Sequence, residues 1–186
     1  MSSEMFSVAR VPSGRPAAGE FAAYAAPDIE AVEGDDAVAA LEAQAEQVLT
    51  LLAPLTDAQV SGRTYAAGKW TLKEVLGHLV DDERIFAYRL LCVARGDTRP
   101  LAGFDERAYV QGARFEAQPL VALLGEYRAV RAATVALLAS LAPDEWRRRG
   151  TVNGYEATVR GLAFHVAGHE LRHLRALRDR YVAGLA

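Results

Sequence analysis

The sequence has little of what marks several protein classes. It holds one cysteine, Cys92, so no intrachain disulfide can form, and this favours a reducing compartment. Cys92 lies in an apolar helical run, where we expect a buried structural thiol rather than a nucleophile. No apolar run reaches the roughly 18 residues of a membrane span, and the first residues lack the apolar core of a signal peptide. These absences predict a cytoplasmic protein without a membrane partner.

Basic residues are also too few for a nucleic-acid partner. The 186 residues include 21 Lys and Arg against 24 Asp and Glu, which gives a net charge of −3. Binding to a phosphate backbone requires a basic footprint, so we expect no nucleic acid. The basic run Arg147–Arg149 stands beside a turn, where such residues are usually solvated. Half of the residues are apolar, enough for one globular domain.

Apolar residues recur at helical spacing in four segments. A capping box at Thr71 and Glu74 predicts the start of the second helix, and Pro119 suits the first position of the third. Four helices with one long connection predict an all-α four-helix bundle. The predicted helices cover residues 36–53, 71–96, 119–141 and 158–182.

The remaining segments are short or irregular. Residues 1–34 are rich in Pro, Gly and Ser, and we expect them to form an arm packed on a bundle of residues 35–186. The connection 97–117 is longer than a turn needs, which predicts short helical turns within it. Asn153-Gly154 is typical of a small hairpin.

Three of the four histidines share one helix face. His165, His169 and His173 are each four residues apart, and residues 169–173 spell H-E-x-x-H. The longer zinc-protease signature requires a glycine and a third histidine where this chain has Ala176 and Asp179. No glutamate follows Glu170 to replace that histidine. We therefore interpret the protease match as a coincidence of spacing.

His78 is the natural third ligand for a metal bound by His169 and His173. It lies on the apolar stripe of the second predicted helix, and a bundle brings inward side chains of different helices together. Three neutral imidazoles leave coordination positions open, as in a catalytic site. They suit zinc, nickel, copper or iron alike.

Five further residues are candidates around this site. His165 is expected to join it, to act as a general base, or to lie toward the bundle end. Asp82 is expected to orient an imidazole N–H, to contact a metal-bound water, or to remain a solvated carboxylate. Glu170 is turned about 100° from His169, so we expect it behind the ligands or in a surface salt bridge. Arg128 and Arg131 would hold a cofactor carboxylate if they face inward, and would otherwise be solvated.

The histidine segments resemble motifs of one family. Residues 69–79 followed by 82–84 resemble the second-helix motif of DinB-like (YfiT-like) proteins, and residues 164–174 resemble their last-helix motif. The segments 15–20 and 103–105 also look like one branch of that family. The resemblance extends over nearly the whole chain, and the two histidine motifs are its specific part.

The resemblance implies an up-down-down-up bundle, often a homodimer, with zinc or nickel held by three histidines. These ligands map onto His78, His169 and His173. Many relatives carry an accessory histidine beside the last ligand, where this chain has Arg172.

Characterised branches of the family include S-transferases and isomerases that use bacillithiol, mycothiol or glutathione. This resemblance makes thiol-dependent transfer to a small-molecule electrophile our first hypothesis. The ion would bind the thiolate, and His165 or Asp82 would move protons. The alternatives are a metal-dependent hydrolase and a non-catalytic, stress-related metal- or ligand-binding protein.

Overall fold

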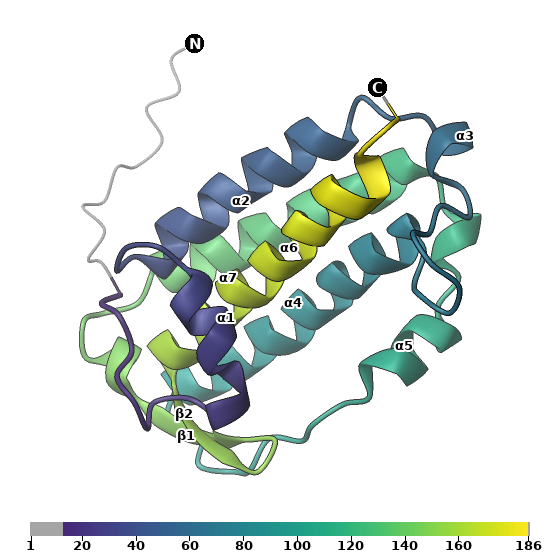
Figure 1. Cartoon of the computed structure of the whole chain (residues 1–186). Coiled ribbons are helices and arrows are strands. Elements are labelled where there is room, and N and C mark those ends of the chain that lie inside the picture. Colours follow the sequence, from purple (N-terminus) through teal and green to yellow (C-terminus); the bar gives the residue numbers. More distant parts are fainter. Residues whose placement is uncertain (1–12, 186) are drawn as a thin grey trace.

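The computed structural model describes residues 13–185, so the first twelve residues of the predicted arm and Ala186 lie outside the described part. Four long helices lie side by side along the molecule (Figure 1). Their ends agree with the predicted segments to within a few residues, which confirms the all-α bundle. They are α2 (Ala37–Leu52), α4 (Leu72–Ala94), α6 (Leu120–Ala139) and α7 (Val159–Ala176).

Capping side chains start three of these helices. Asp36 accepts from the N–H groups of the first turn of α2, and Thr158 does so for α7. The predicted capping box of Thr71 and Glu74 is present at the start of α4. The predicted start of α6 at Pro119 is corrected by one residue. Pro119 has an extended ψ of 141°, so it is the N-cap residue and the helix begins at Leu120.

The packing of the helix ends shows the direction of each helix. One buried cluster joins the end of α2, the starts of α4 and α6, and the end of α7. The other joins the start of α2, the ends of α4 and α6, and the start of α7. Hence α4 and α6 run parallel to each other and antiparallel to α2 and α7. This is the expected up-down-down-up order.

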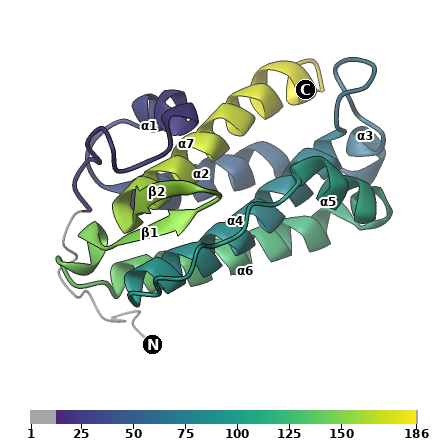
Figure 2. The same cartoon turned by 90° about the horizontal axis from the view of Figure 1, so that it is seen from below.

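Because α4 and α6 are parallel, the chain between them must return along the bundle. This crossover runs beside α4 and carries α5 (Glu106–Gly112) and a 3₁₀ turn (Phe115–Ala117), as predicted (Figure 2). The Phe115 ring packs where α4 has Gly77, so closely that a Cβ there would overlap the ring. Gly77 is thus the point at which the crossover packs closely against α4.

The predicted hairpin is also present. Strands β1 (Arg149–Val152) and β2 (Tyr155–Thr158) pair antiparallel, and Asn153 and Gly154 take φ of 53° and 80° in the turn. Such left-handed angles suit Asn-Gly hairpins. Leu101 of the crossover bridges to Val152, so the hairpin supports the crossover near the end of α4.

The described part of the arm crosses α7. It carries the short helix α1 (Ala26–Ala31), and Glu20 forms an ion pair with Arg160 at 2.6 Å. A Cβ at Gly161 or Gly168 of α7 would overlap the backbone of Glu20 or Asp28. Two glycines thus allow the arm to approach α7 closely, and this brings Asp28 beside the histidine face.

The remaining elements are small. A short helix, α3 (Asp57–Val60), precedes α4, and the chain closes with a π-helical segment (Leu177–Val182). Cys92 is only half-buried against the core, less than we expected for a structural thiol. Among the described residues, no helix is both long and apolar enough to cross a membrane.

We predict opposite effects for two glycine-to-alanine changes in the helices. Alanine favours a helix over glycine by about 1 kcal/mol. Gly125→Ala in α6 meets open space and should raise the free energy of unfolding by up to that amount. Gly77→Ala should lower it by about 1–3 kcal/mol because the new methyl meets Phe115. Urea denaturation of both variants measures the difference. Equal stabilisation by both would contradict the close packing of Phe115 against Gly77.

Candidate metal centre

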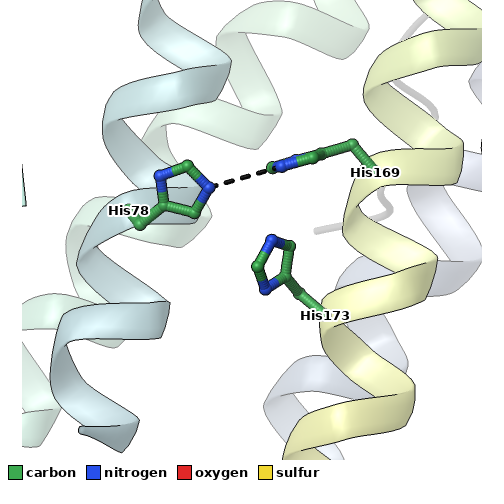
Figure 3. Close-up of side chains that lie close together, drawn as sticks. All are labelled: His78, His169 and His173. Carbon is green, nitrogen blue, oxygen red and sulfur yellow. Dashed lines mark hydrogen bonds between the residues drawn. The ribbon is translucent and has the colours of Figure 1, made fainter. Parts of the chain in front are cut away.

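Three histidines converge between α4 and α7. His78 projects from α4, and His169 and His173 project toward it from successive turns of α7 (Figure 3). One nitrogen from each ring lies within 4.8 Å of the others, and the Nε2 atoms of His78 and His169 are 3.3 Å apart. His78 and His169 are buried and His173 is partly open. The structure therefore brings together the three residues predicted as ligands.

The environment keeps these rings neutral. Burial, with the charge of Arg172 nearby, lowers the pKa of His78 to about 4. Burial and the neighbouring His78 lower the pKa of His173 to about 3. Burial also holds the pKa of His169 well below its usual value. Imidazole binds metal in its neutral form. At pH 7 the three rings therefore do not have to lose a proton before they bind a divalent ion.

Asp82 lies behind one ligand. Its Oδ2 is 3.5 Å from Nδ1 of His169, while Nε2 of the same ring faces His78. A carboxylate in this position orients a ligating imidazole and makes it more basic. Burial raises the pKa of Asp82 to about 7. The carboxylate is thus placed to orient His169, the first of the two roles expected for it.

Glu106 is a neighbour that the sequence did not reveal. It comes from α5 in the crossover, and its Oε2 lies 3.9 Å from Nε2 of His78. Its side chain is 53% exposed. No spacing relates Glu106 to the histidines, because the fold of the crossover alone brings it there.

A pocket of about 660 Å³ opens over the histidines. His169 and His173 form part of its floor, so a ligand in the pocket would meet the candidate ion. This volume is typical of small-molecule sites. The walls come from the loop before α4, from α5 and from the end of the chain, and include Trp70, Glu106, Val110 and Tyr181.

His165 lies one turn from the trio but outside it. Its ring centroid is 6.2 Å from that of His169, and its Nδ1 is 3.7 Å from Oδ2 of Asp28. That nitrogen is buried without a hydrogen-bond partner among the described residues. Burial lowers the pKa of His165, so its ring is also neutral. Its place is the rim of a second pocket, toward the arm.

Glu170 differs from expectation because it is buried in the bundle and not at the surface. It accepts hydrogen bonds from Tyr127 and from Arg131 of α6. Arg131 also forms an ion pair with Glu83 of α4 at 2.8 Å and donates to the backbone oxygen of Leu41. Helix α7 packs against its neighbours on more than one side, so the face beside the histidines is also interior.

Neither arginine proposed for a cofactor carboxylate lies at the pocket. All three guanidinium nitrogens of Arg131 are engaged by Glu83, Glu170 and Leu41. Arg128 is exposed on α6 and lines none of the described pockets near the histidines. The structure therefore gives no support to that role, since the interior position of Arg131 serves an ion pair.

The fold and the site define a four-helix bundle with a three-histidine candidate metal centre. The model of the DinB superfamily matches residues 40–177, well over half of the chain, and the chain belongs to this superfamily. A search among curated proteins found no match.

A solved structure supports the fold. YfiT from Bacillus subtilis, described as a probable metal-dependent hydrolase with an unusual four-helix bundle topology, superimposes with a TM-score of 0.70. The similarity covers 81% of this chain and 88% of that one, at 18% sequence identity. At this identity the likeness shows the shared bundle.

We predict graded losses of metal from three variants. His78→Ala removes one of three ligands and should abolish binding of a divalent ion, measured by elemental analysis of the purified protein. Asp82→Asn should weaken affinity by about 10- to 100-fold, the usual effect of losing a carboxylate behind a ligating histidine. Asp81→Asn, on the outer face of α4 beside Arg84, is the control and should bind as the wild type does. Full occupancy in His78→Ala would contradict the assignment.

We also predict that the metal-free protein loses stability as the pH falls from 7 to about 5. The unfolded chain protonates its histidines near pH 6.5, whereas burial keeps the folded rings neutral to lower pH. Unfolding therefore takes up protons in this range and becomes easier. Asp82 acts in the opposite sense, because its folded pKa is raised to about 7, but it is one group against four.

Urea denaturation at both pH values measures this effect. His173→Gln removes one titrating ring and should make the loss of stability smaller. An unchanged midpoint between pH 7 and 5 in the wild type would contradict burial of neutral histidines.

Proposed function

We propose that this protein is a divalent-metal-dependent hydrolase that acts on an ester or amide bond of a small molecule. The observation that carries the proposal is the convergence of three neutral imidazoles, two of which line an open pocket, with a carboxylate beside the third. The description of YfiT as a probable metal-dependent hydrolase agrees with it. Both features together favour hydrolysis over binding alone.

In this proposal each residue of the site has a distinct role. His78, His169 and His173 hold the ion, and Asp82 orients the ring of His169. A divalent ion bound there polarises a carbonyl and lowers the pKa of water. With three protein ligands, the site leaves room for substrate and water.

Glu106 is the best-placed general base. It reaches within 3.9 Å of His78 from the opposite side of the pocket mouth, and its exposed carboxylate can accept a proton from water. It can then return that proton to the leaving group. A carboxylate in this position accelerates hydrolysis, in which water must lose a proton, whereas binding of a thiolate to an ion does not need it.

Thiol-dependent transfer, the first hypothesis from the sequence, is the rival activity. It rested on the family resemblance, with Arg128 and Arg131 as candidates to hold a cofactor carboxylate if they face inward. Arg131 is engaged by two glutamates, and Arg128 is exposed away from the pocket. The structure thus favours hydrolysis, and an assay with a low-molecular-weight thiol and an electrophile separates the two.

Zinc or nickel is our proposal for the ion, since three imidazoles suit both. A homodimer and a cytoplasmic location also stay predictions. Size-exclusion chromatography with light scattering tests the first, and elemental analysis identifies the metal.

We predict that Glu106→Gln lowers kcat for an ester or amide substrate by about 10²- to 10⁴-fold, the range for loss of a general base. Metal content should not change, because the three histidines remain. Glu46→Gln, an exposed glutamate on α2, is the matched control and should keep wild-type activity. The measurement is turnover of chromogenic esters and amides by the metal-loaded protein.

The same assays decide among the alternatives. Turnover that requires an added thiol would replace hydrolysis by transfer. If the metal-loaded protein acts on neither set of substrates, a non-catalytic metal- or ligand-binding role is favoured and our proposal is wrong.

A further inference from the structure

A second pocket adjoins the candidate metal centre. Its volume is about 250 Å³, and it shares Glu106, His169 and Arg172 with the larger pocket. The arm, α4, the crossover, the hairpin turn and α7 all contribute to its wall. A ligand in the larger pocket could therefore extend one end into the smaller one.

Arg89 of α4 is the unusual residue of this pocket. It is only 4% exposed, yet no carboxylate of the described residues lies within ion-pair distance of it. Its Nη2 donates to the backbone oxygen of Ala102 at 2.7 Å, and its guanidinium lies 4.8 Å and 5.6 Å from the ring centres of Phe86 and Phe104. Its other nitrogens make no hydrogen bond to described residues.

A buried guanidinium without a bonded anion is costly, so such a group is usually paired. Burial lowers the pKa of Arg89, as expected for a desolvated cation. The other charges of the pocket already have neighbours within 4 Å. Asp28 lies beside Arg172 and His165, while Asp82 faces His169. Asp82 attracts Arg89 through space, but no acceptor among the described residues other than Ala102 is hydrogen-bonded to its guanidinium.

A second unsatisfied group lies in the same wall. Nδ1 of His165 is buried without a hydrogen-bond partner among the described residues. Arg89 and His165 both line the pocket, and Nδ1 of His165 is enclosed beside Asp28. The rings of Phe86 and Phe104 flank the guanidinium of Arg89, to which a charge-assisted hydrogen bond is stronger than a neutral one.

We propose that the second pocket binds a carboxylate of the substrate, held by the guanidinium of Arg89, while the scissile ester or amide lies at the three histidines. The substrate class is then a small ester or amide that carries a free carboxylate. This inference rests on the proposed hydrolase function. Arg89 is seven positions after Asp82 in α4, about 10 Å of helix rise, so the substrate must span a distance of this order between its carboxylate and its scissile bond.

The pocket favours a carboxylate over a phosphate. Its volume admits only the end of a molecule, and three carboxyl groups also line it, from Asp28, Asp82 and Glu106. A planar carboxylate matches one guanidinium, whereas a phosphate concentrates more negative charge on one group and would meet stronger repulsion from these neighbours.

The test uses succinate as the probe, with succinamide as its uncharged counterpart, titrated into the metal-loaded protein by calorimetry. Succinate should bind saturably and succinamide should not. Arg89→Met should weaken succinate binding by about 10- to 100-fold, the effect of losing a charge-assisted hydrogen bond. Arg84→Gln loses the same charge from the exposed face of α4 and should bind as the wild type does.

Two further measurements keep the proposal falsifiable if Arg89→Met does not fold. Arg89→Lys keeps the charge but loses the planar fork, and should show a smaller loss of affinity. In the ¹⁵N-labelled wild type, the Nε–Hε signal of Arg89, assigned by its absence from the lysine variant, should shift on addition of succinate.

Three results would overturn the inference. The first is equal succinate affinity of the wild type and the Arg89 variants, which would place the probe on the ion. The others are an Arg89 signal that does not shift on addition of succinate, and binding of inorganic phosphate that is tighter than binding of succinate. The proposed hydrolase function is tested separately. Succinate binding without any ester or amide turnover would leave the carboxylate site standing, and turnover without succinate binding would leave only the hydrolase.

Discussion

One buried arginine joins all four helices of the bundle. Arg131 of α6 pairs with Glu83 of α4 and Glu170 of α7, and donates to the backbone oxygen of Leu41 in α2. Removing one partner of such a buried pair typically costs about 3–5 kcal/mol, because the other charge is left without compensation. A sliding of one helix along another would break these contacts. The network therefore specifies a single axial alignment of the helices.

That alignment carries the candidate metal centre. Glu83 follows Asp82 in α4, and Glu170 follows His169 in α7, so each glutamate of the network is adjacent in sequence to a residue of the site. Successive helical residues point about 100° apart, which places the network on one side of the two helices and the site on the other. Bringing Glu83 and Glu170 to one arginine also brings Asp82 to within 3.5 Å of His169. The bundle core and the site are thus aligned by the same contacts.

Much of this could be read from the sequence, because helix spacing, caps and turn residues act locally. The three ligands followed from His169 and His173 on one stripe and His78 on another. Arg131 and Glu170 were misjudged because a single helix does not show which of its faces meets a neighbour. Arg89 was missed, although it continues the stripe of Asp82 and Phe86 along α4, and that continuation was a usable signal. Glu106 depends on how the crossover folds, which no local pattern encodes.

The parallel course of α4 and α6 has a consequence for how such a protein diversifies. It obliges the chain to lay a long connection across the mouth of the site, anchored where Phe115 meets Gly77. Glu106 and Val110 in one pocket and Phe104 in the other belong to this connection, while the ligands belong to the helices. The candidate metal ligands therefore lie in the helices, while one wall of each pocket lies in a separate stretch of chain. Exchange of this one connection would therefore reshape a wall of both pockets and leave the three candidate ligands in place.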